Sequence, residues 1–140
     1  MTPRHKDAQL VLEREGFTIH APKKRKGQKV TFNYFVARAL RAVDPRFRED
    51  AKQLKQRLFD GSYFKVMPDA YRISVRDQLV EVVEVEGTGR VSSNRMAYYA
   101  NLYWLLEYVE WELRLHLLDV RTNSRMPVDF WELERIEVSQ

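Results

Sequence analysis

Three carboxylates stand on segments that are expected to be extended. Asp69 opens a predicted strand over residues 71–75, and Glu84 and Glu86 belong to the next strand, over residues 79–86. Side chains of a strand alternate between its two faces, so Glu84 and Glu86 project from the same side, and we expect Asp69 to meet them from the neighbouring strand. Carboxylate oxygens are hard ligands that suit Mg²⁺ or Mn²⁺. The spacing therefore predicts a divalent cation held by Asp69 and Glu84, with Glu86 as a third candidate ligand.

A cation in such a site would serve phosphodiester hydrolysis. It activates a water molecule, neutralises the phosphate and helps the leaving oxygen to depart. The alternative is an ordinary solvated strand, because glutamates on an exposed strand face are common and Val82 shares a side with both glutamates. The sequence leaves both interpretations open.

The elements that must position these carboxylates follow from changes in hydrophobic period and from Gly, Pro and capping residues. Helices are expected over residues 3–15, 33–43, 45–59 and 94–109, strands over 63–66, 71–75, 79–86 and 111–120, a brief extended piece over 17–20, and a short helix or edge strand within 127–138. With 140 residues the chain is one domain, with a basic helical part over 1–60 and a sheet and helix core over 61–140. The order of helices, three strands, helix and strand predicts an α/β fold with a mixed central sheet of about four strands flanked by helices.

This arrangement resembles the PD-(D/E)XK nuclease superfamily. The family core is a helix, three strands, a helix and a further strand, with an aspartate on the second strand and acid-x-lysine on the third. Pro68-Asp69 and Glu84-Val85-Glu86 occupy those places. The resemblance implies a restriction-endonuclease-like core and a Mg²⁺-dependent endonuclease or exonuclease with Asp69, Glu84 and Glu86 at its metal site.

One position departs from the family pattern, because Glu86 stands where the family carries lysine. Some branches of the superfamily place that cation on the following helix, and the resemblance then puts Arg95 in its place, with Lys65 as an alternative. An arginine essentially never deprotonates, so Arg95 would contact a phosphate or stabilise charge in the transition state. The second hypothesis is a catalytically inactive accessory protein on the same scaffold that binds nucleic acid or protein, of the kind that a phage or mobile element encodes.

The formal charge of +4 is concentrated in the first half of the chain. A dense run within residues 23–29 is predicted to be an exposed loop that contacts nucleic-acid phosphates, most consistent with DNA. Its basic residues are Lys23, Lys24, Arg25, Lys26 and Lys29. A basic loop that serves only solubility is the alternative, and no motif for sequence-specific readout is present.

Several classes of function are excluded by composition. The absence of cysteine excludes thiol chemistry, and the scattered His5, His20 and His116 do not form a zinc motif. No window approaches the roughly 18 apolar residues of a membrane span, and the amino terminus lacks the apolar segment of an ordinary export signal, so a cytoplasmic protein is expected.

An aromatic cluster lies at helical spacing near the second half of the chain. Its members are Tyr98, Tyr99, Tyr103, Trp104, Tyr108 and Trp111. Such a cluster is typical of a core, with Tyr98 expected to be its exposed member, although stacking on unpaired bases is the alternative. An interface for a homodimer, formed by exposed aromatics and the acidic second half, is a third hypothesis.

Overall fold

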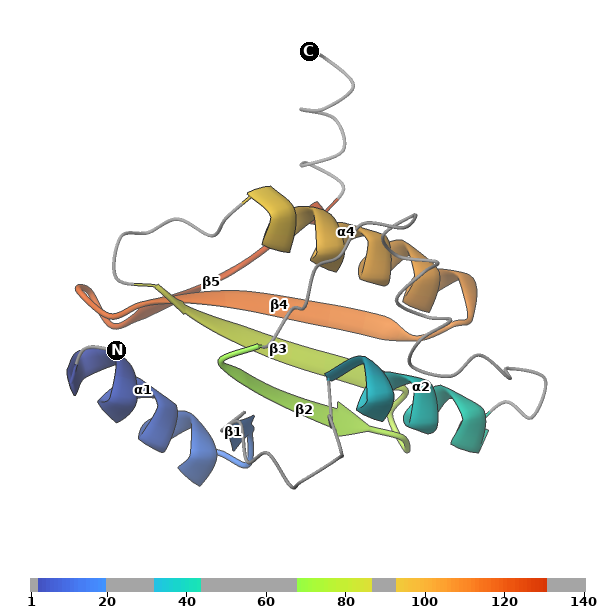
Figure 1. Ribbon diagram of the computed structural model, residues 1–140, viewed down its shortest axis with the longest axis horizontal. Coiled ribbons are helices and arrows are strands. Elements are labelled where there is room, and N and C mark those ends of the chain that lie inside the picture. The colour runs from blue at the N-terminus through green and yellow to red at the C-terminus, as the bar shows by residue number, and fades with distance from the viewer. Residues whose placement is uncertain (1–2, 20–31, 44–67, 87–92, 131–140) are drawn as a thin grey trace, which may run out of the picture.

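A computed structural model describes residues 3–19, 32–43, 68–86 and 93–130 (Figure 1). The helices and strands are α1 (Pro3–Arg14), β1 (Thr18–Ile19), α2 (Phe32–Val43), β2 (Ala70–Ser74), β3 (Leu79–Glu86), α4 (Ser93–Tyr108), β4 (Glu112–Asp119) and β5 (Ser124–Pro127). None of the helices in this part of the chain is long and apolar enough to cross a membrane.

The described strands form one mixed, open sheet in the order β1-β2-β3-β4-β5. β3 and β4 are parallel, and the remaining neighbours are antiparallel. The parallel pair requires a crossover connection, and α4 provides it between β3 and β4. The carboxyl ends of β3 and β4 therefore lie side by side at one end of the sheet.

Helices cover both faces of the sheet (Figure 1). α2 and α4 pack on one face over the larger core, which includes Val80, Val82, Leu113 and Leu115. α1 packs on the other face over a smaller core that consists of Leu12, Phe17, Ala70, Val83, Val85 and Leu118. The alternation of β3 therefore places even-numbered residues toward α4 and odd-numbered residues toward α1.

The ends and faces of the helices follow from local sequence. α1 ends before Gly16, whose φ of 97° is a left-handed conformation that glycine adopts without strain. α4 buries Tyr98, Tyr99, Leu102, Leu105 and Leu106, which recur at helical spacing on one side. The aromatic cluster is therefore mainly core, as expected.

The prediction that Tyr98 is the exposed aromatic residue was wrong. Tyr98 is fully buried and packs edge-on against Tyr99, with ring centroids 5.4 Å apart. Tyr108 is the exposed one, at 82%. It lies at the last residue of α4, on the same stripe as the exposed Ala97 and Asn101, which faces away from the sheet.

Most expected elements within the described residues are confirmed with bounds that differ by one or two residues. The sheet has five strands among the described residues where about four were predicted. Three of the predicted strands are β2, β3 and β4, the extended piece predicted over 17–20 pairs as β1, and β5 (Ser124–Pro127), which has no alternating pattern, is the strand that was not predicted. The helix expected over 45–59 and the strand expected over 63–66 lie outside the described residues.

Candidate active site

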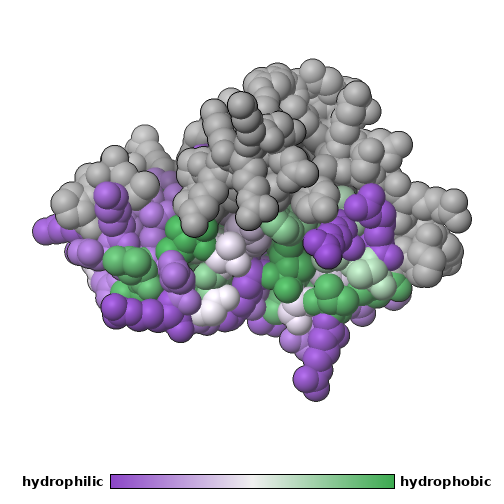
Figure 2. Space-filling model, turned by 60° about the horizontal axis from the view of Figure 1, so that its bottom comes forward, coloured by the Kyte–Doolittle hydropathy of each residue, from purple (hydrophilic) through white to green (hydrophobic). Residues whose placement is uncertain are grey.

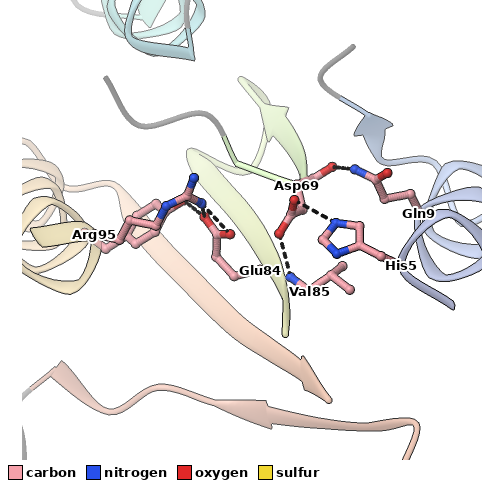
Figure 3. Close-up of polar contacts among 7 residues, drawn as sticks. His5, Gln9, Asp69, Glu84, Val85 and Arg95 are labelled. Carbon is pink, nitrogen blue, oxygen red and sulfur yellow. Dashed lines mark hydrogen bonds and ion pairs between the residues drawn. The ribbon is translucent and has the colours of Figure 1, made fainter. Parts of the chain in front are cut away.

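Asp69 and Glu84 meet at the edge between β2 and β3. Ala70 pairs with Val83 in the antiparallel register, so Asp69, the residue before Ala70, is laterally next to Glu84. Side chains at such neighbouring positions have Cβ atoms about 4.5–5.5 Å apart. The two acidic residues that the sequence assigned to one site are therefore neighbours, but the carboxyl group of Glu84 is directed toward Arg95 and that of Asp69 toward His5 and the N–H of Val85 (Figure 3).

Asp69 is held in place from two directions. His5 Nε2 lies 3.1 Å from Asp69 Oδ1, and the backbone N–H of Val85 donates to Asp69 Oδ2 at 2.8 Å. Gln9 Nε2 donates to the backbone oxygen of Asp69 at 3.2 Å. His5 and Gln9 are four residues apart on α1, so both reach Asp69 from the same face of that helix (Figure 3).

Glu84 is fully buried and is bound from the opposite side by α4. Arg95 Nη1 donates to both carboxylate oxygens of Glu84, at 3.0 and 2.9 Å. The hydroxyl of Tyr99, one turn further along α4, also donates to Glu84 Oε1. A buried carboxylate needs such donors, because an unpaired charge in the interior is strongly unfavourable.

The environment favours the protonated form of Glu84. Burial raises the pKa of Glu84 to about 8, and hydrogen bonding and like charge from Asp69 act in the same direction, while Tyr99 and Arg95 oppose the rise. Burial also raises the pKa of Glu86, followed by the charge of Asp69, while Arg95 and His5 oppose that rise. The charge of Asp69 thus raises the pKa of both glutamates, and the three carboxyl groups concentrate negative potential where β2 and β3 meet.

The site lies at the end of the sheet where β3 ends and where α1 and α4 begin (Figure 1). Each helix carries a partial positive charge at its amino end, and that charge favours anions. In α/β sheets, ligands bind outside the carboxyl ends of parallel strands for this reason and because the loops there leave space. The positive helix ends therefore partly offset the negative potential of the carboxyl groups.

The structure brings together the predicted residues Asp69, Glu84, Glu86 and Arg95. Arg95, however, forms an ion pair with Glu84. Within residues 3–19, 32–43, 68–86 and 93–130, no group of three or more His, Cys, Asp or Glu side chains is arranged to hold a metal ion. The predicted phosphate-binding residues Lys23, Lys24, Arg25, Lys26 and Lys29, together with Lys65, lie outside the described residues.

Sequence reasoning missed three participants of the site. His5 was set aside because no second histidine stands at ligand spacing, and Tyr99 was assigned to the core, where its ring does lie. The spacing of His5 and Gln9 shows that they share a helix face, but no local pattern shows that this face packs on Asp69. Their role depends on how α1 docks on the sheet.

Comparison of the chain with protein-family models, with curated proteins and with solved structures gave no match. The functional conclusion therefore rests on the geometry of the site.

Proposed function

We propose that the protein hydrolyses phosphodiester bonds of nucleic acid with a Mg²⁺ ion bound by Asp69 and Glu84. The observation that carries this proposal is the placement of two carboxyl groups on neighbouring strands, one of them fully buried and with its pKa raised to about 8. Like charges held together are destabilising unless a proton or a cation joins them. Carboxylate oxygens are the ligands that Mg²⁺ prefers, so the donor atoms suit that ion, which would have to displace Arg95 from Glu84 together with the proton that a pKa of about 8 keeps there.

The order of the elements supports the finer assignment of a restriction-endonuclease-like core. Of the three consecutive strands that the resemblance implies, β2 and β3 correspond to the second and third and are followed by α4 and β4, while the first, predicted over 63–66, lies outside the described residues. Asp69 immediately precedes the second of these strands, and Glu84 and Glu86 lie on the third. This is the order that the resemblance to PD-(D/E)XK nucleases implies.

The chain's own residues would divide the work. Asp69 and Glu84 would bind the ion, which supplies Lewis acidity and an activated water when bound. His5 and the N–H of Val85 fix the orientation of Asp69. Arg95, which is paired with Glu84, would be the residue to contact a phosphate if a cation were held by Glu84 instead.

The test is Mg²⁺-dependent cleavage of DNA by the purified protein. Supercoiled plasmid and labelled single-stranded and double-stranded oligonucleotides are incubated with Mg²⁺, with Mn²⁺ and with EDTA. Asp69→Asn and Glu84→Gln should each lower the rate by about 100-fold or more, because several kcal/mol of transition-state stabilisation depends on the ion. Glu81→Gln is the matched control, since Glu81 lies on the same strand and faces away from the site.

If Asp69→Asn and Glu84→Gln cleave DNA at the rate of wild type, the site assignment is wrong. Circular dichroism of each variant at the assay pH separates lost chemistry from lost folding.

A non-catalytic binding protein is the second candidate, and the Arg95–Glu84 ion pair favours it. Arg95 already provides Glu84 with a positive partner, in the place where a metal ion would neutralise it. Under this hypothesis no cleavage occurs with either metal, and nucleic-acid affinity is the same in EDTA and in Mg²⁺. Titration calorimetry of Mg²⁺ into wild type and into Glu84→Gln distinguishes the two hypotheses. The hydrolase requires that wild type binds Mg²⁺ and that Glu84→Gln does not, whereas the binding protein requires no such difference.

A further inference from the structure

We propose that the outer face of α1 is the interface of a symmetric homodimer, in which the α1 helices of two copies of the chain pack antiparallel. The inference does not depend on the proposed hydrolysis. α1 packs on the sheet through Gln9 and Leu12, which are both buried, so the opposite side of the helix is directed to solvent. Leu10 and Val11 lie on that outer side, with 52% and 51% of their surfaces exposed.

Leu10 and Val11 form an apolar patch on a face that is otherwise charged. Of the large hydrophobic residues that are exposed in the described part of the chain, only these two are neighbours in sequence. Asp7 lies one turn before them and Arg14 one turn after them, and the four residues form one stripe of the helix. Figure 2 shows hydrophobic side chains among hydrophilic ones on the side of the molecule that carries α1. Exposed apolar residues that are grouped and rimmed by charges mark an interaction surface.

The charges at the two ends of the stripe fit a second copy of the chain. In an antiparallel pair centred on the patch, Leu10 of one copy lies opposite Val11 of the other, and Asp7 lies opposite Arg14. The two-fold symmetry forms each of these contacts twice. A parallel pair would instead place Asp7 against Asp7 and Arg14 against Arg14, and like charges that face each other are unfavourable. The sequence of α1 therefore favours the antiparallel arrangement.

The flank of the stripe is complementary in the same sense. Lys6 and Glu13 are seven residues apart and lie on the same side of the stripe. Antiparallel helices bring equivalent flanks together, so Lys6 of one copy lies near Glu13 of the other. Among the ion pairs formed within the described residues, none involves Lys6, Asp7, Glu13 or Arg14. The dimer thus gives these four charged groups partners of opposite sign.

The size of the contact predicts a weak dimer. The 12 residues of α1 extend over about 18 Å. An interface between two such helices belongs to the transient class, which buries less than about 1,200 Å². Leu10 and Val11 supply the apolar contact, and the ion pairs set the direction of the helices. We therefore expect the dimer at high protein concentration only.

Sedimentation velocity of the full chain from about 10 µM to about 1 mM, the range of weak complexes, tests the inference. Asp7→Lys and Arg14→Glu should each weaken dimerisation by about tenfold, because each places two pairs of like charges in the symmetric interface. The double variant with both substitutions should regain the affinity of wild type, because opposite charges then face each other again. Leu10→Ala should weaken dimerisation by about tenfold or more, since the apolar contact is lost twice.

Matched controls carry the same kinds of change at exposed positions outside α1. Arg38→Glu on α2 and Glu107→Lys on α4 reverse a charge, and Val75→Ala shortens an exposed apolar side chain. These three variants should dimerise as wild type does. Circular dichroism of every variant checks that its helices are retained.

A chain that stays monomeric at about 1 mM would overturn the inference. A dimer that Asp7→Lys, Arg14→Glu and Leu10→Ala leave unchanged would also overturn it, since the interface would then lie elsewhere. If the chain stays monomeric and instead cosediments with phosphatidylglycerol vesicles, and Leu10→Ala abolishes this binding, the patch contacts a lipid surface and the dimer is wrong.

Discussion

Glu81 and Glu84 lie three residues apart on β3, and each forms an ion pair with an arginine, yet their surroundings differ. Glu81 is directly opposite Arg72, whose Nε and Nη2 donate to its two oxygens at 2.9 and 3.1 Å. The side chains of this pair are partly open to solvent, with 16% of Glu81 and 41% of Arg72 exposed. Glu84 is fully buried, is laterally next to Asp69, and receives only one nitrogen of Arg95.

The difference separates a structural pair from a functional candidate. Opposite charges on neighbouring strands stabilise a sheet, and like charges there destabilise it. Arg72 also lies over the ring of Phe17 at 4.2 Å and donates to the backbone oxygen of Glu15, so it ties β1 and α1 to β2. Glu84 also ties α4 to β3, through Arg95 and Tyr99, but it is fully buried and is held beside a second carboxyl group. Unfavourable burial of this kind is concentrated at functional sites.

The largest expected difference between the two glutamates is in the pH dependence of stability. The pKa of Glu84 rises from the ordinary value of 4.5 to about 8 in the folded protein because of burial and Asp69. Between these two pH values the folded state retains a proton that the unfolded chain has released. The stability from this group is therefore complete below about pH 4.5 and is lost as the pH rises through 8.

Urea unfolding of wild type and Glu84→Gln from pH 5 to 9 measures this effect. The free energy of unfolding of wild type, relative to the variant, should fall by several kcal/mol over that range. Asp69→Asn should move the fall to lower pH, because the Asp69 carboxyl raises the pKa of Glu84. A flat difference across the range would show that folding leaves the pKa of Glu84 unchanged.

A smaller effect is expected when the arginine of the buried pair is removed. Arg95→Gln should lower the free energy of unfolding by about 3 kcal/mol above pH 8, where Glu84 is ionised and would lose its positive partner. The loss should be smaller at pH 6, because a protonated Glu84 does not require a cation. Urea unfolding at pH 6 and pH 9 checks this prediction, and an equal loss at both values would show that Arg95 acts through packing alone.

The smallest effect is expected at the partly exposed pair. Glu81→Gln and Arg72→Gln, combined in a double-mutant cycle, should give a coupling free energy of about 0.5–1 kcal/mol. Added salt should reduce it, since exposed charges are screened. A coupling as large as that between Arg95 and Glu84 at pH 9 would break the distinction between the two pairs.

Much of the scaffold could be predicted because its signals are local. The helical spacing of Tyr98, Leu102 and Leu105 predicts a buried face of α4, and the extended segments of β2 and β3 end where turn residues occur. The extended piece predicted over 17–20 corresponds to β1, whereas β5 was not predicted at Ser124–Pro127, because its four exposed residues show no apolar period. The burial of Tyr98 depended on how α4 rotates against the sheet, and sequence spacing does not fix that rotation.

The sequence by itself determined that Glu84 and Glu86 share one face of a strand, because the alternation of a strand is a property of the backbone. Only the tertiary structure decided that Asp69 is next to Glu84, since this depends on the register of β2 against β3. It also decided that His5, 64 residues from Asp69 along the chain, and Arg95, 11 residues from Glu84, complete the site. These contacts come from the docking of α1 and α4 on the sheet, which is set by burial over many residues and by no single motif.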